Sequence, residues 1–385
     1  MITNNSWIIS NHFFCVNSFW LNRKILKINY KTTYFDIKYH MKKIVFTGGG
    51  TLGHVMPNLY LINELKGYDI SYIGSNGIEK EKVSRIVKYY TIPATKFVRG
   101  KFWANFKIPF ILISAIHKSK KILKKIKPNV VFSKGGYVSL PVCIAARKLK
   151  IPIIAHESDF SFGLANRIIL KLCNTMCVNF KNLENTNKKI VYTGPIFSKD
   201  FENETINKSS LHLDENKPTI LIVGGSLGSK KINEVIFTIH KDLIEKYNII
   251  HITGKGNCAV KSHDNYNAFE MRNDMPNLYN ISDFVIGRSG AGVTAECFFK
   301  RVPMLLIPLE NGASRGDQLQ NAKYYEKQGV ATIMREKDLT PLSLLKLIDE
   351  IFKNKQKYIK SYEDIKTVNG KEKILQLIEK SCLDK

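Results

Sequence analysis

The sequence predicts an α/β protein in which two doubly wound parallel sheets, each in a Rossmann-like domain, face one another across a cleft. At 385 residues the chain is long enough for two domains of ordinary size. Residues 42–66 and 218–236 each run from an apolar strand through a glycine-rich turn into a helix. Because the strands are continuous apolar runs that alternate with helical patterns, we expect parallel sheets buried on both faces.

The rest of the first half repeats this pattern of strand, turn and helix. Apolar strands open residues 70–83 and 151–158, and another lies near the start of residues 128–150. Each strand ends in small or polar residues, and right-handed crossovers would place these strands side by side in one parallel sheet. We expect the first domain to span residues 41–197.

The second half continues in the same way from its opening unit. Further strand patterns fall in residues 249–256, 282–301 and 302–312. We expect the second domain to span residues 198–370. A last helix, about residues 371–383, is expected to cross back and pack on the first domain.

Residues 1–40 differ from the rest of the chain. They have several aromatic residues but no clean apolar core and no small-residue cleavage site, so a secretory signal is a poor match. A transit-like leader is one interpretation. An upstream extension or a misassigned start is favoured, because Met41 directly precedes the first strong strand. The status of this segment in the mature protein stays open.

The composition restricts the partners and the compartment. The formal net charge is +26, from 59 Lys and Arg against 33 Asp and Glu. Such a charge attracts nucleic acid, an anionic membrane surface or a phosphate-rich substrate, although a coding bias toward Lys, Asn and Ile would also produce it. Seven scattered cysteines favour a reducing cytoplasm, and Cys173 and Cys177 are expected on one apolar helix. No apolar run reaches the roughly 18 to 20 residues that span a bilayer.

Glycine clusters follow the strands where open α/β sheets bind ligands, so we expect both halves to contribute to one cleft. Residues 48–53 match GxGxxG, but the next strand ends without the acid that a dinucleotide site uses for ribose. A dinucleotide oxidoreductase is therefore the weaker alternative to a turn whose amides hold a diphosphate. His54 begins the following helix, whose positive end favours a neutral imidazole that accepts a proton from a hydroxyl. A capping or packing role for His54 is equally compatible.

Three motifs of the second half suit a nucleotide sugar. The turn 224–228 (GGSLG) offers the hydroxyl and amide of Ser226 to a phosphate, unless it is simply a tight turn. Residues 288–296 (RSGAGVTAE) combine a glycine loop for phosphate with Glu296 for the ribose diol, unless that glutamate faces solvent. Residues 315–322 (RGDQLQNA) place amide side chains on one helical face, where they suit sugar hydroxyls or cap the helix.

Two segments of the first half have open roles. His156 and Glu157 of the HESD sequence end the fourth strand. They are candidates to position an acceptor or a catalytic group, or are ordinary loop residues. Residues 99–127 interleave aromatic, aliphatic and basic residues. This pattern is typical of a segment at an anionic lipid interface and also of a core helix with a solvated basic face.

Six motifs resemble, in order and spacing, those of the MurG family of N-acetylglucosaminyltransferases: GGGTLGHVMPNL, SKGGYVSLP, HESD, GGSLGS, RSGAGVTAE and DQLQNA. The resemblance runs from Met41 to near the C-terminus. It implies a GT-B fold and inverting transfer of N-acetylglucosamine from UDP-N-acetylglucosamine to the muramoyl C4 hydroxyl of undecaprenyl-diphosphate-linked muramoyl pentapeptide. That reaction converts lipid I to lipid II in peptidoglycan synthesis. The resemblance also implies a peripheral enzyme at the cytoplasmic face of the cell membrane, with an anionic membrane surface as a partner, no nucleic acid, no cofactor and no metal site.

The resemblance carries functional residues over by motif. His54 is then the proposed base, and Glu157 is a second catalytic candidate. Thr51, Gly53 and Asn166 belong to the acceptor and its diphosphate. The donor site comprises six residues: Ser226, Arg288, Gly290, Glu296, Gln318 and Asn321.

Several positions depart from the residues that are usual in the family. Leu52 stands where a glycine is usual, Leu227 where a glutamine is usual, and Phe197 where an arginine is common. Val293 replaces a usual threonine, with Thr294 adjacent, and HESD replaces the commoner HEQN. These departures leave room for a related transferase that uses another lipid acceptor. The non-enzymatic rival is a basic nucleic-acid-binding protein, which would leave the glycine loops without an explanation.

Overall fold

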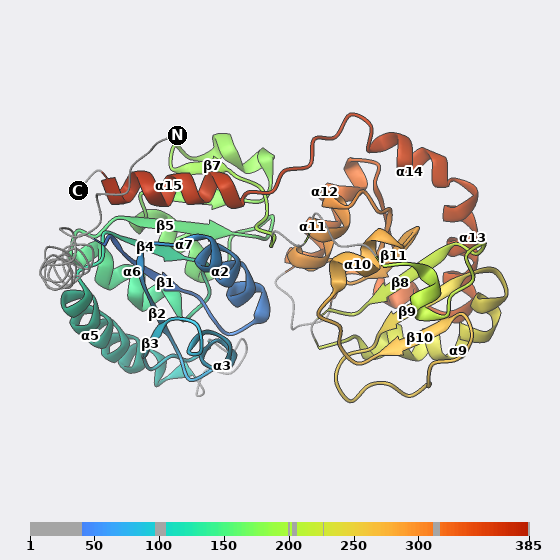
Figure 1. Ribbon diagram of the computed structural model, residues 1–385, viewed down its shortest axis with the longest axis horizontal. Helices are drawn as coiled ribbons and strands as arrows, with labels where there is room; N and C mark the ends of the chain where they lie inside the picture. The colour runs from blue at the N-terminus through green and yellow to red at the C-terminus, as the bar shows by residue number, and fades with distance from the viewer. Residues whose placement is uncertain are drawn as a thin grey trace, which may run out of the picture.

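The computed structural model describes residues 41–96, 105–198, 201, 206–225, 227–310 and 316–383. Two α/β domains lie side by side, each built on one parallel sheet (Figure 1). Apolar clusters cover both faces of each sheet. The fold class predicted from the sequence, two doubly wound parallel sheets, is confirmed.

The first sheet has the strand order β3-β2-β1-β4-β5-β6-β7, and its neighbouring strands are parallel. Alternate residues of β1 point to opposite faces: Val45 packs with α5 and α6, whereas Ile44 and Phe46 pack with α2 and the last helix, α15. The strands are β1 (Lys43–Thr47), β2 (Asp69–Gly74), β3 (Lys88–Thr91), β4 (Val130–Ser133), β5 (Ile153–Glu157), β6 (Thr175–Val178) and β7 (Ile190–Tyr192). The helices are α2 (Leu52–Glu64), α3 (Ile78–Val83), α5 (Ile108–Ile126), α6 (Ser139–Lys148) and α7 (Leu164–Leu172), with a 3-10 turn at Lys181–Thr186.

The second sheet has the strand order β10-β9-β8-β11-β12-β13, again parallel throughout. In β8, Ile220 and Ile222 pack with α9 and α13, whereas Leu221 and Val223 pack with α11 and α12. The strands are β8 (Thr219–Val223), β9 (Asn248–Ile252), β10 (Tyr266–Phe269), β11 (Phe284–Gly287), β12 (Met304–Leu306) and β13 (Ala331–Ile333). The helices are α9 (Lys230–Lys246), α10 (Met275–Asn280), α11 (Ala291–Phe299), α12 (Asp317–Lys327), α13 (Pro341–Lys353), α14 (Lys355–Ser361) and α15 (Lys371–Leu383), with 3-10 turns at Lys208–Leu211 and Glu336–Asp338.

Each sheet reverses its strand order once, between β1 and β4 in the first domain and between β8 and β11 in the second. At such a switch point the chain leaves the two strands toward opposite faces of the sheet, and a crevice opens at their carboxyl ends. The loops after these four strands are therefore the places to look for the functional site.

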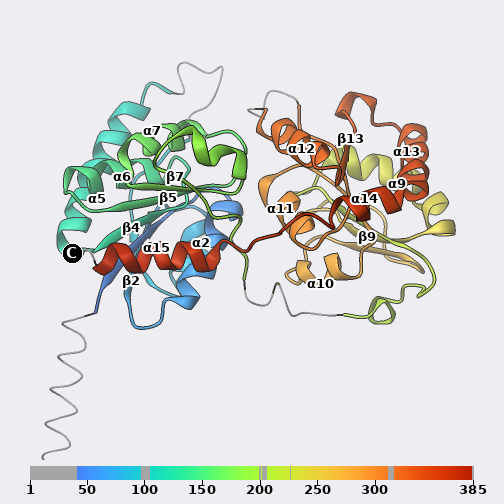
Figure 2. The same ribbon diagram turned by 90° about the horizontal axis from the view of Figure 1, so that it is seen from above.

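The last helix, α15, lies against the first domain, although it follows the second in sequence (Figure 2). Ile374 and Ile378 are buried there, and Lys371 pairs with Glu64 of α2 at 3.0 Å. Just before it, Gly370 donates its N–H to the carbonyl of Pro195 at 2.6 Å. The end of the chain thus ties the second domain to the first.

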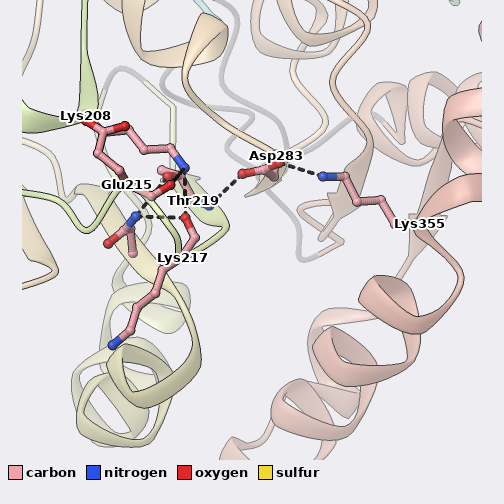
Figure 3. A network of polar contacts seen from close by, with 7 residues as sticks. Lys208, Glu215, Lys217, Thr219, Asp283 and Lys355 are labelled. Atoms are coloured by element: carbon pink, nitrogen blue, oxygen red, sulfur yellow. Dashed lines mark hydrogen bonds and ion pairs between the residues drawn. The ribbon is translucent and has the colours of Figure 1, made fainter.

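A polar network lies at the amino ends of β8 and β11 in the second sheet, at the end away from the switch point (Figure 3). The Asp283 carboxylate accepts from the Thr219 N–H at 2.8 Å and pairs with Lys355 Nζ at 2.5 Å. Lys208 Nζ donates to the Lys217 carbonyl at 2.8 Å. These contacts attach α14 and the segment before β8 to the amino ends of the strands. They lie at the end of the sheet away from the switch point.

The expectation of one helix carrying Cys173 and Cys177 is wrong. The helix α7 ends at Leu172, Cys173 caps it, and Cys177 lies in β6. The chain changes direction at Asn174, whose side-chain oxygen accepts from the Ile153 N–H at 3.0 Å. That contact joins the segment to β5 and begins a strand.

Candidate active site

Two glycine loops of the first domain interlock at the switch point between β1 and β4. Gly50 (φ +84°) lies so close to Tyr137 that an added Cβ would be 2.7 Å from its ring. Gly136 (φ +82°) would place a Cβ 3.1 Å from the Gly49 carbonyl oxygen and 3.2 Å from His54 Nδ1. Glycine alone combines a positive φ with this close approach. The two loops therefore hold His54 at the switch point.

His54 lies in the first turn of α2 and is half-buried. Its Nδ1 is 3.1 Å from the Gly49 carbonyl oxygen and 3.2 Å from the Thr51 hydroxyl. Because a carbonyl oxygen can only accept, the Gly49 contact places the ring proton on Nδ1. In the neutral form of the ring, Nε2 is then the unprotonated nitrogen, which is the atom that a general base uses.

The buried side chain of Glu79 holds the first glycine loop through hydrogen bonds to its backbone. Glu79 is fully buried, and it accepts from the Gly50 N–H at 3.2 Å and from the Ser75 N–H at 2.9 Å. A Cβ on Gly49 would lie 2.5 Å from this carboxyl group. The sequence did not single out Glu79, because a glutamate in the first turn of a short helix usually caps that helix or faces solvent.

Thr51 and Gly53 are both exposed where α2 begins. Thr51 is the N-cap residue in an extended conformation, and within the part of the chain that the structure describes a Cβ on Gly53 would come near the Thr51 hydroxyl alone, at 3.8 Å. The start of the helix is thus accessible to an anion, which backbone N–H groups and the helix dipole favour.

Glu157 organises the loop after β5. One carboxylate oxygen accepts from the N–H groups of Ser158 and Asp159 at 2.9 and 3.1 Å. The other accepts from the Gly163 N–H at 3.1 Å and from Asn166 Nδ2 at 3.0 Å. A carboxylate that already accepts four N–H donors is suited to positioning a loop, and this geometry does not favour the catalytic role that the sequence suggested for Glu157.

Asn166 is buried behind that loop. Its Nδ2 also donates to the His156 carbonyl at 3.2 Å. A Cβ on Gly135 (φ +90°) would lie 2.6 Å from the Asn166 amide. Asn166 therefore supports the second glycine loop from within the domain, and the sequence had suggested a direct acceptor contact.

A lysine and a histidine are buried beside these loops. Burial lowers the pKa of Lys134 to about 8, against the opposing attraction of Glu157 and Asp159. Its Nζ donates to the Ser158 hydroxyl at 2.5 Å. Burial and the charge of Lys134 hold the pKa of His156 well below its usual range, so His156 is neutral near pH 7.

The second domain presents an open helix start and a partly buried acid. Gly290 is the N-cap of α11, and among the described residues no atom beyond its chain neighbours and its own helix backbone lies within 4 Å of the position that its Cβ would take. Glu296 follows on the same helix and accepts from the Tyr279 hydroxyl at 2.8 Å. Burial raises the pKa of Glu296 to about 7, and the Tyr279 hydrogen bond limits the rise. This pair offers helix amides for a phosphate and a carboxylate for a diol.

Arg288 turns into the domain. Its guanidinium donates to the carbonyls of Ile307 and Pro308 at 3.1 and 3.4 Å and pairs with Glu336. The residue is 8% exposed. Arg288 thus holds the first residues after β12, and both of its terminal nitrogens make contacts inside the protein.

Two amide side chains of α12 also make contacts within the chain. Gln318 Oε1 accepts from the Leu309 N–H at 2.9 Å. Asn321 is fully buried, and its Nδ2 donates to the Ser289 carbonyl at 3.1 Å. The α12 helix is therefore fastened to the loops after β11 and β12, and the predicted helical face lies at the switch point of the second sheet.

Comparisons with known proteins cover both domains. The glycosyltransferase family 28 N-terminal domain matches residues 44–178, and the glycosyltransferase family 28 C-terminal domain matches residues 219–378. Two curated relatives, from Clostridium novyi and Clostridium tetani, are each 43% identical over 88% of this chain and 98% of their own length. Both are named UDP-N-acetylglucosamine–N-acetylmuramyl-(pentapeptide) pyrophosphoryl-undecaprenol N-acetylglucosamine transferase. The chain belongs to the MurG family of glycosyltransferases.

Solved structures agree with this membership. Acinetobacter baumannii MurG is 25% identical and superposes with a TM-score of 0.70, covering 88% of this chain and 99% of its own. The calicheamicin glycosyltransferase CalG4 is 13% identical with a TM-score of 0.66, over 89% of this chain and 98% of its own, and shows a shared fold alone. The recognition from six motifs and the expectation of a glycosyltransferase are both confirmed.

One donor residue carried over from the MurG family, Ser226, lies outside the described residues. The glycines on either side of it are constrained by packing: a Cβ on Gly224 would lie 2.3 Å from the Ser229 amide nitrogen, and one on Gly228 would lie 1.9 Å from the Thr253 carbonyl oxygen. Packing therefore requires glycine at positions 224 and 228, and the phosphate role of Ser226 stays a prediction.

Phe197 and Leu227 depart from the MurG pattern with different structural consequences. Phe197 is buried, stacks on Phe201 with ring centroids 4.6 Å apart, and packs against Phe299 at 4.9 Å. An aromatic cluster thus occupies the place that the family usually gives to an arginine. Leu227 is 85% exposed.

Proposed function

We propose that this chain transfers N-acetylglucosamine from UDP-N-acetylglucosamine to the muramoyl C4 hydroxyl of undecaprenyl-diphosphate-linked muramoyl pentapeptide, with inversion at the anomeric carbon. The observation that carries the proposal is the 43% identity to transferases named for this reaction, over 98% of their length. The site geometry supports it, because a candidate base lies at one switch point and a candidate nucleotide site at the other.

The reaction is a direct displacement. The acceptor hydroxyl oxygen forms a bond to the anomeric carbon while its proton passes to Nε2 of His54. The bond between the anomeric carbon and the UDP oxygen breaks, and UDP leaves with the electron pair. Backbone N–H groups at the start of α11 stabilise the charge that develops on the diphosphate.

The donor is assigned to the second domain. Gly290 and the α11 amides face the diphosphate, Glu296 accepts from the ribose hydroxyls, and Gln318 lies near the sugar. Ser226 contributes a further phosphate contact. Arg288, which is paired within the domain, acts on the donor by shaping the loop after β12.

The acceptor is assigned to the first domain. Thr51, Gly53 and the first amides of α2 receive its diphosphate, close to His54. Glu157 and Asn166 hold the neighbouring loops in place, as their contacts with Gly163 and His156 indicate.

The function is tested by measuring UDP release and the formation of a disaccharide product. The purified chain is incubated with UDP-N-acetylglucosamine and a short-chain polyprenyl-diphosphate muramoyl pentapeptide. Parallel reactions replace the acceptor with a diacylglycerol or the donor with UDP-glucose. Product from the muramoyl acceptor alone supports the proposal, whereas product from the diacylglycerol alone would assign the chain to another lipid acceptor.

We further propose that the enzyme docks on an anionic membrane through the outer face of α5, at the cytoplasmic side. Phe106, Phe110 and Ile113 are 64%, 67% and 66% exposed, so they are not part of a helix core. Phe110 and Ile113 lie three residues apart on α5, and Lys121 and Lys124 continue the same face. Phe106 lies just before the helix begins. Exposed apolar residues beside cations suit the boundary between headgroups and acyl chains. Within the described residues, no helix has the length and apolar character needed to cross a bilayer.

Replacing Phe106, Phe110 and Ile113 together with serine is expected to weaken binding to phosphatidylglycerol vesicles by about tenfold or more, because three apolar side chains lose their place in the bilayer. Co-sedimentation measures the effect. The matched control is Leu342→Ser, since Leu342 is 64% exposed on α13 of the other domain. Equal losses in the two variants, or no loss in the triple variant, would contradict the assignment of this face.

A further inference from the structure

One buried side chain joins the two domains at the site. Asn321 of α12 accepts from the Phe160 N–H at 2.9 Å through Oδ1. Its Nδ2 donates to Asp159 Oδ1 at 3.1 Å and to the Ser289 carbonyl at 3.1 Å. Phe160 and Asp159 belong to the loop after β5 in the first domain, whereas Asn321 and Ser289 belong to the second. The amide of Asn321 therefore bridges the domains with both of its ends.

Each end of this bridge is fixed to a part of the site. In the first domain, Glu157 accepts from the Asp159 N–H, so the bridge is tied to the loop behind the acceptor region. In the second domain, Ser289 directly precedes the N-cap of α11, and its hydroxyl donates to the Gln318 carbonyl at 2.8 Å. The positions of the loop after β5 and of the loop after β11 are therefore coupled through Asn321.

Aromatic packing between the two domains lies beside the bridge. The Tyr324 ring of α12 lies 6.0 Å from the Phe160 ring and 4.8 Å from the Phe180 ring of the first domain. Asn321 is fully buried, so leaving its amide without a partner would be costly. Asp159 also decides which way the Asn321 amide faces, because a carboxylate accepts from the NH2 end and leaves the oxygen end to the Phe160 N–H.

We propose that Asp159 and Asn321 are a pair of positioning residues that set the closed arrangement of the two domains, so that the donor on α11 and α12 faces the acceptor beside His54. The pair does not touch the reacting atoms. This inference rests on the proposed function and gives Asn321 a different role from the donor contact that its motif suggested. It also explains how an aspartate, at a position where the family commonly has asparagine, serves here: the carboxylate still provides the acceptor oxygen that the bridge needs.

The test is a double-mutant cycle on the full-length chain. Asp159→Ala and Asn321→Ala are each expected to lower kcat about tenfold, because small errors in the approach of donor and acceptor slow transfer strongly. The double variant should lose little more than the worse single variant, since the two side chains act as one unit. Asp159→Asn keeps the acceptor oxygen and should stay within about threefold of the parent. The affinity for UDP should remain within about twofold in the two Asp159 variants, because Asp159 lies in the first domain and the UDP site is assigned to the second.

Several outcomes would overturn the proposal. Losses in kcat that multiply in the double variant would show that the two residues act independently. A loss in Asp159→Asn equal to that in Asp159→Ala would exclude the hydrogen bond as the cause. Asp69→Ala, at an exposed aspartate of β2, controls for the loss of a surface charge. If Asn321→Ala fails to fold, the comparison of Asp159→Ala with Asp159→Asn still decides.

Small-angle scattering with UDP separates this inference from the proposed function. Asp159→Ala is expected to have a larger radius of gyration than the parent chain and Asp159→Asn, because the closed arrangement loses a contact. If the parent chain does not glycosylate the muramoyl acceptor, the proposed function fails, and the scattering difference still tests the bridge. If Asp159→Ala had the same radius of gyration and the same kcat as the parent chain, the proposed role of the Asp159–Asn321 pair would be wrong.

Discussion

Replacing His54 with alanine is expected to lower kcat by about 10² to 10⁴, the usual contribution of a positioned general base. The reason is the tautomer: the Gly49 carbonyl, 3.1 Å from Nδ1, places the ring proton there and makes Nε2 the proton acceptor. The affinity for UDP should not change, because the donor is assigned to the other domain. Initial rates with the muramoyl acceptor and calorimetric binding of UDP measure the two effects separately.

His263→Ala is the matched control, since His263 is an exposed histidine on the second domain. It should leave kcat at the parent value. Normal turnover by His54→Ala would remove His54 as the base. A fall in kcat that tracked an equal loss of thermal stability would indicate that the side chain serves the glycine loop instead.

The KM for UDP-N-acetylglucosamine is expected to rise as the pH falls below about 7, because protonation removes the negative charge with which Glu296 receives the ribose hydroxyls. Burial raises the pKa of Glu296 to about 7, so the carboxylate is ionised above that pH and neutral below it. Hydrogen bonds to a charged group contribute about 1.5 to 3 kcal/mol. Their loss corresponds to a KM higher by roughly tenfold to a hundredfold.

Two variants separate this titration from others in the protein. Glu296→Gln should have a raised KM that no longer changes across this pH range. Tyr279→Phe removes the hydrogen bond that limits the rise in the Glu296 pKa, so its transition should move to higher pH. A KM for Glu296→Gln that still rose below pH 7 would assign the titration to another group.

The same shift predicts the sign of a stability effect. The folded protein holds a proton on Glu296 between its ordinary pKa of 4.5 and about 7, where the unfolded chain releases it. The stability that this proton contributes is present in full below about 4.5 and is lost as the pH rises through about 7. Glu296→Gln abolishes this contribution, and thermal melts across the range measure it.

Local sequence patterns predicted the elements of the fold more successfully than the contacts of the site. The apolar runs of β1 and β8 and the glycines that follow them gave two parallel sheets correctly. In a short apolar stretch the same reasoning was wrong: Cys173 and Cys177 were expected on one helix, but Asn174 turns the chain toward β5 between them. Hydrophobic periodicity distinguishes helix from strand poorly over four or five residues.

The site residues differ in how far the sequence could predict their roles. His54 follows a glycine turn at the start of a helix, so the order of strand, glycine turn and helix in the sequence was enough to predict its place at the switch point. Glu157 and Arg288 were chosen as chemistry-bearing residues, but the contacts of each are made inside its own domain. Glu79 and Lys134 were not chosen at all, because a buried charge looks like a surface charge in a single sequence.

The sequence by itself determined the two doubly wound domains, the glycine turns at their switch points and the glycosyltransferase family, because apolar runs, turn residues and motif order are properties of neighbouring residues. Only the tertiary structure decided that Asn321 joins the domains through Asp159 and Phe160, which lie 162 and 161 residues away along the chain. Hydrogen-bond partners at such separations depend on how two complete domains meet. Their pairing therefore appears only once both sheets have folded and closed on one another.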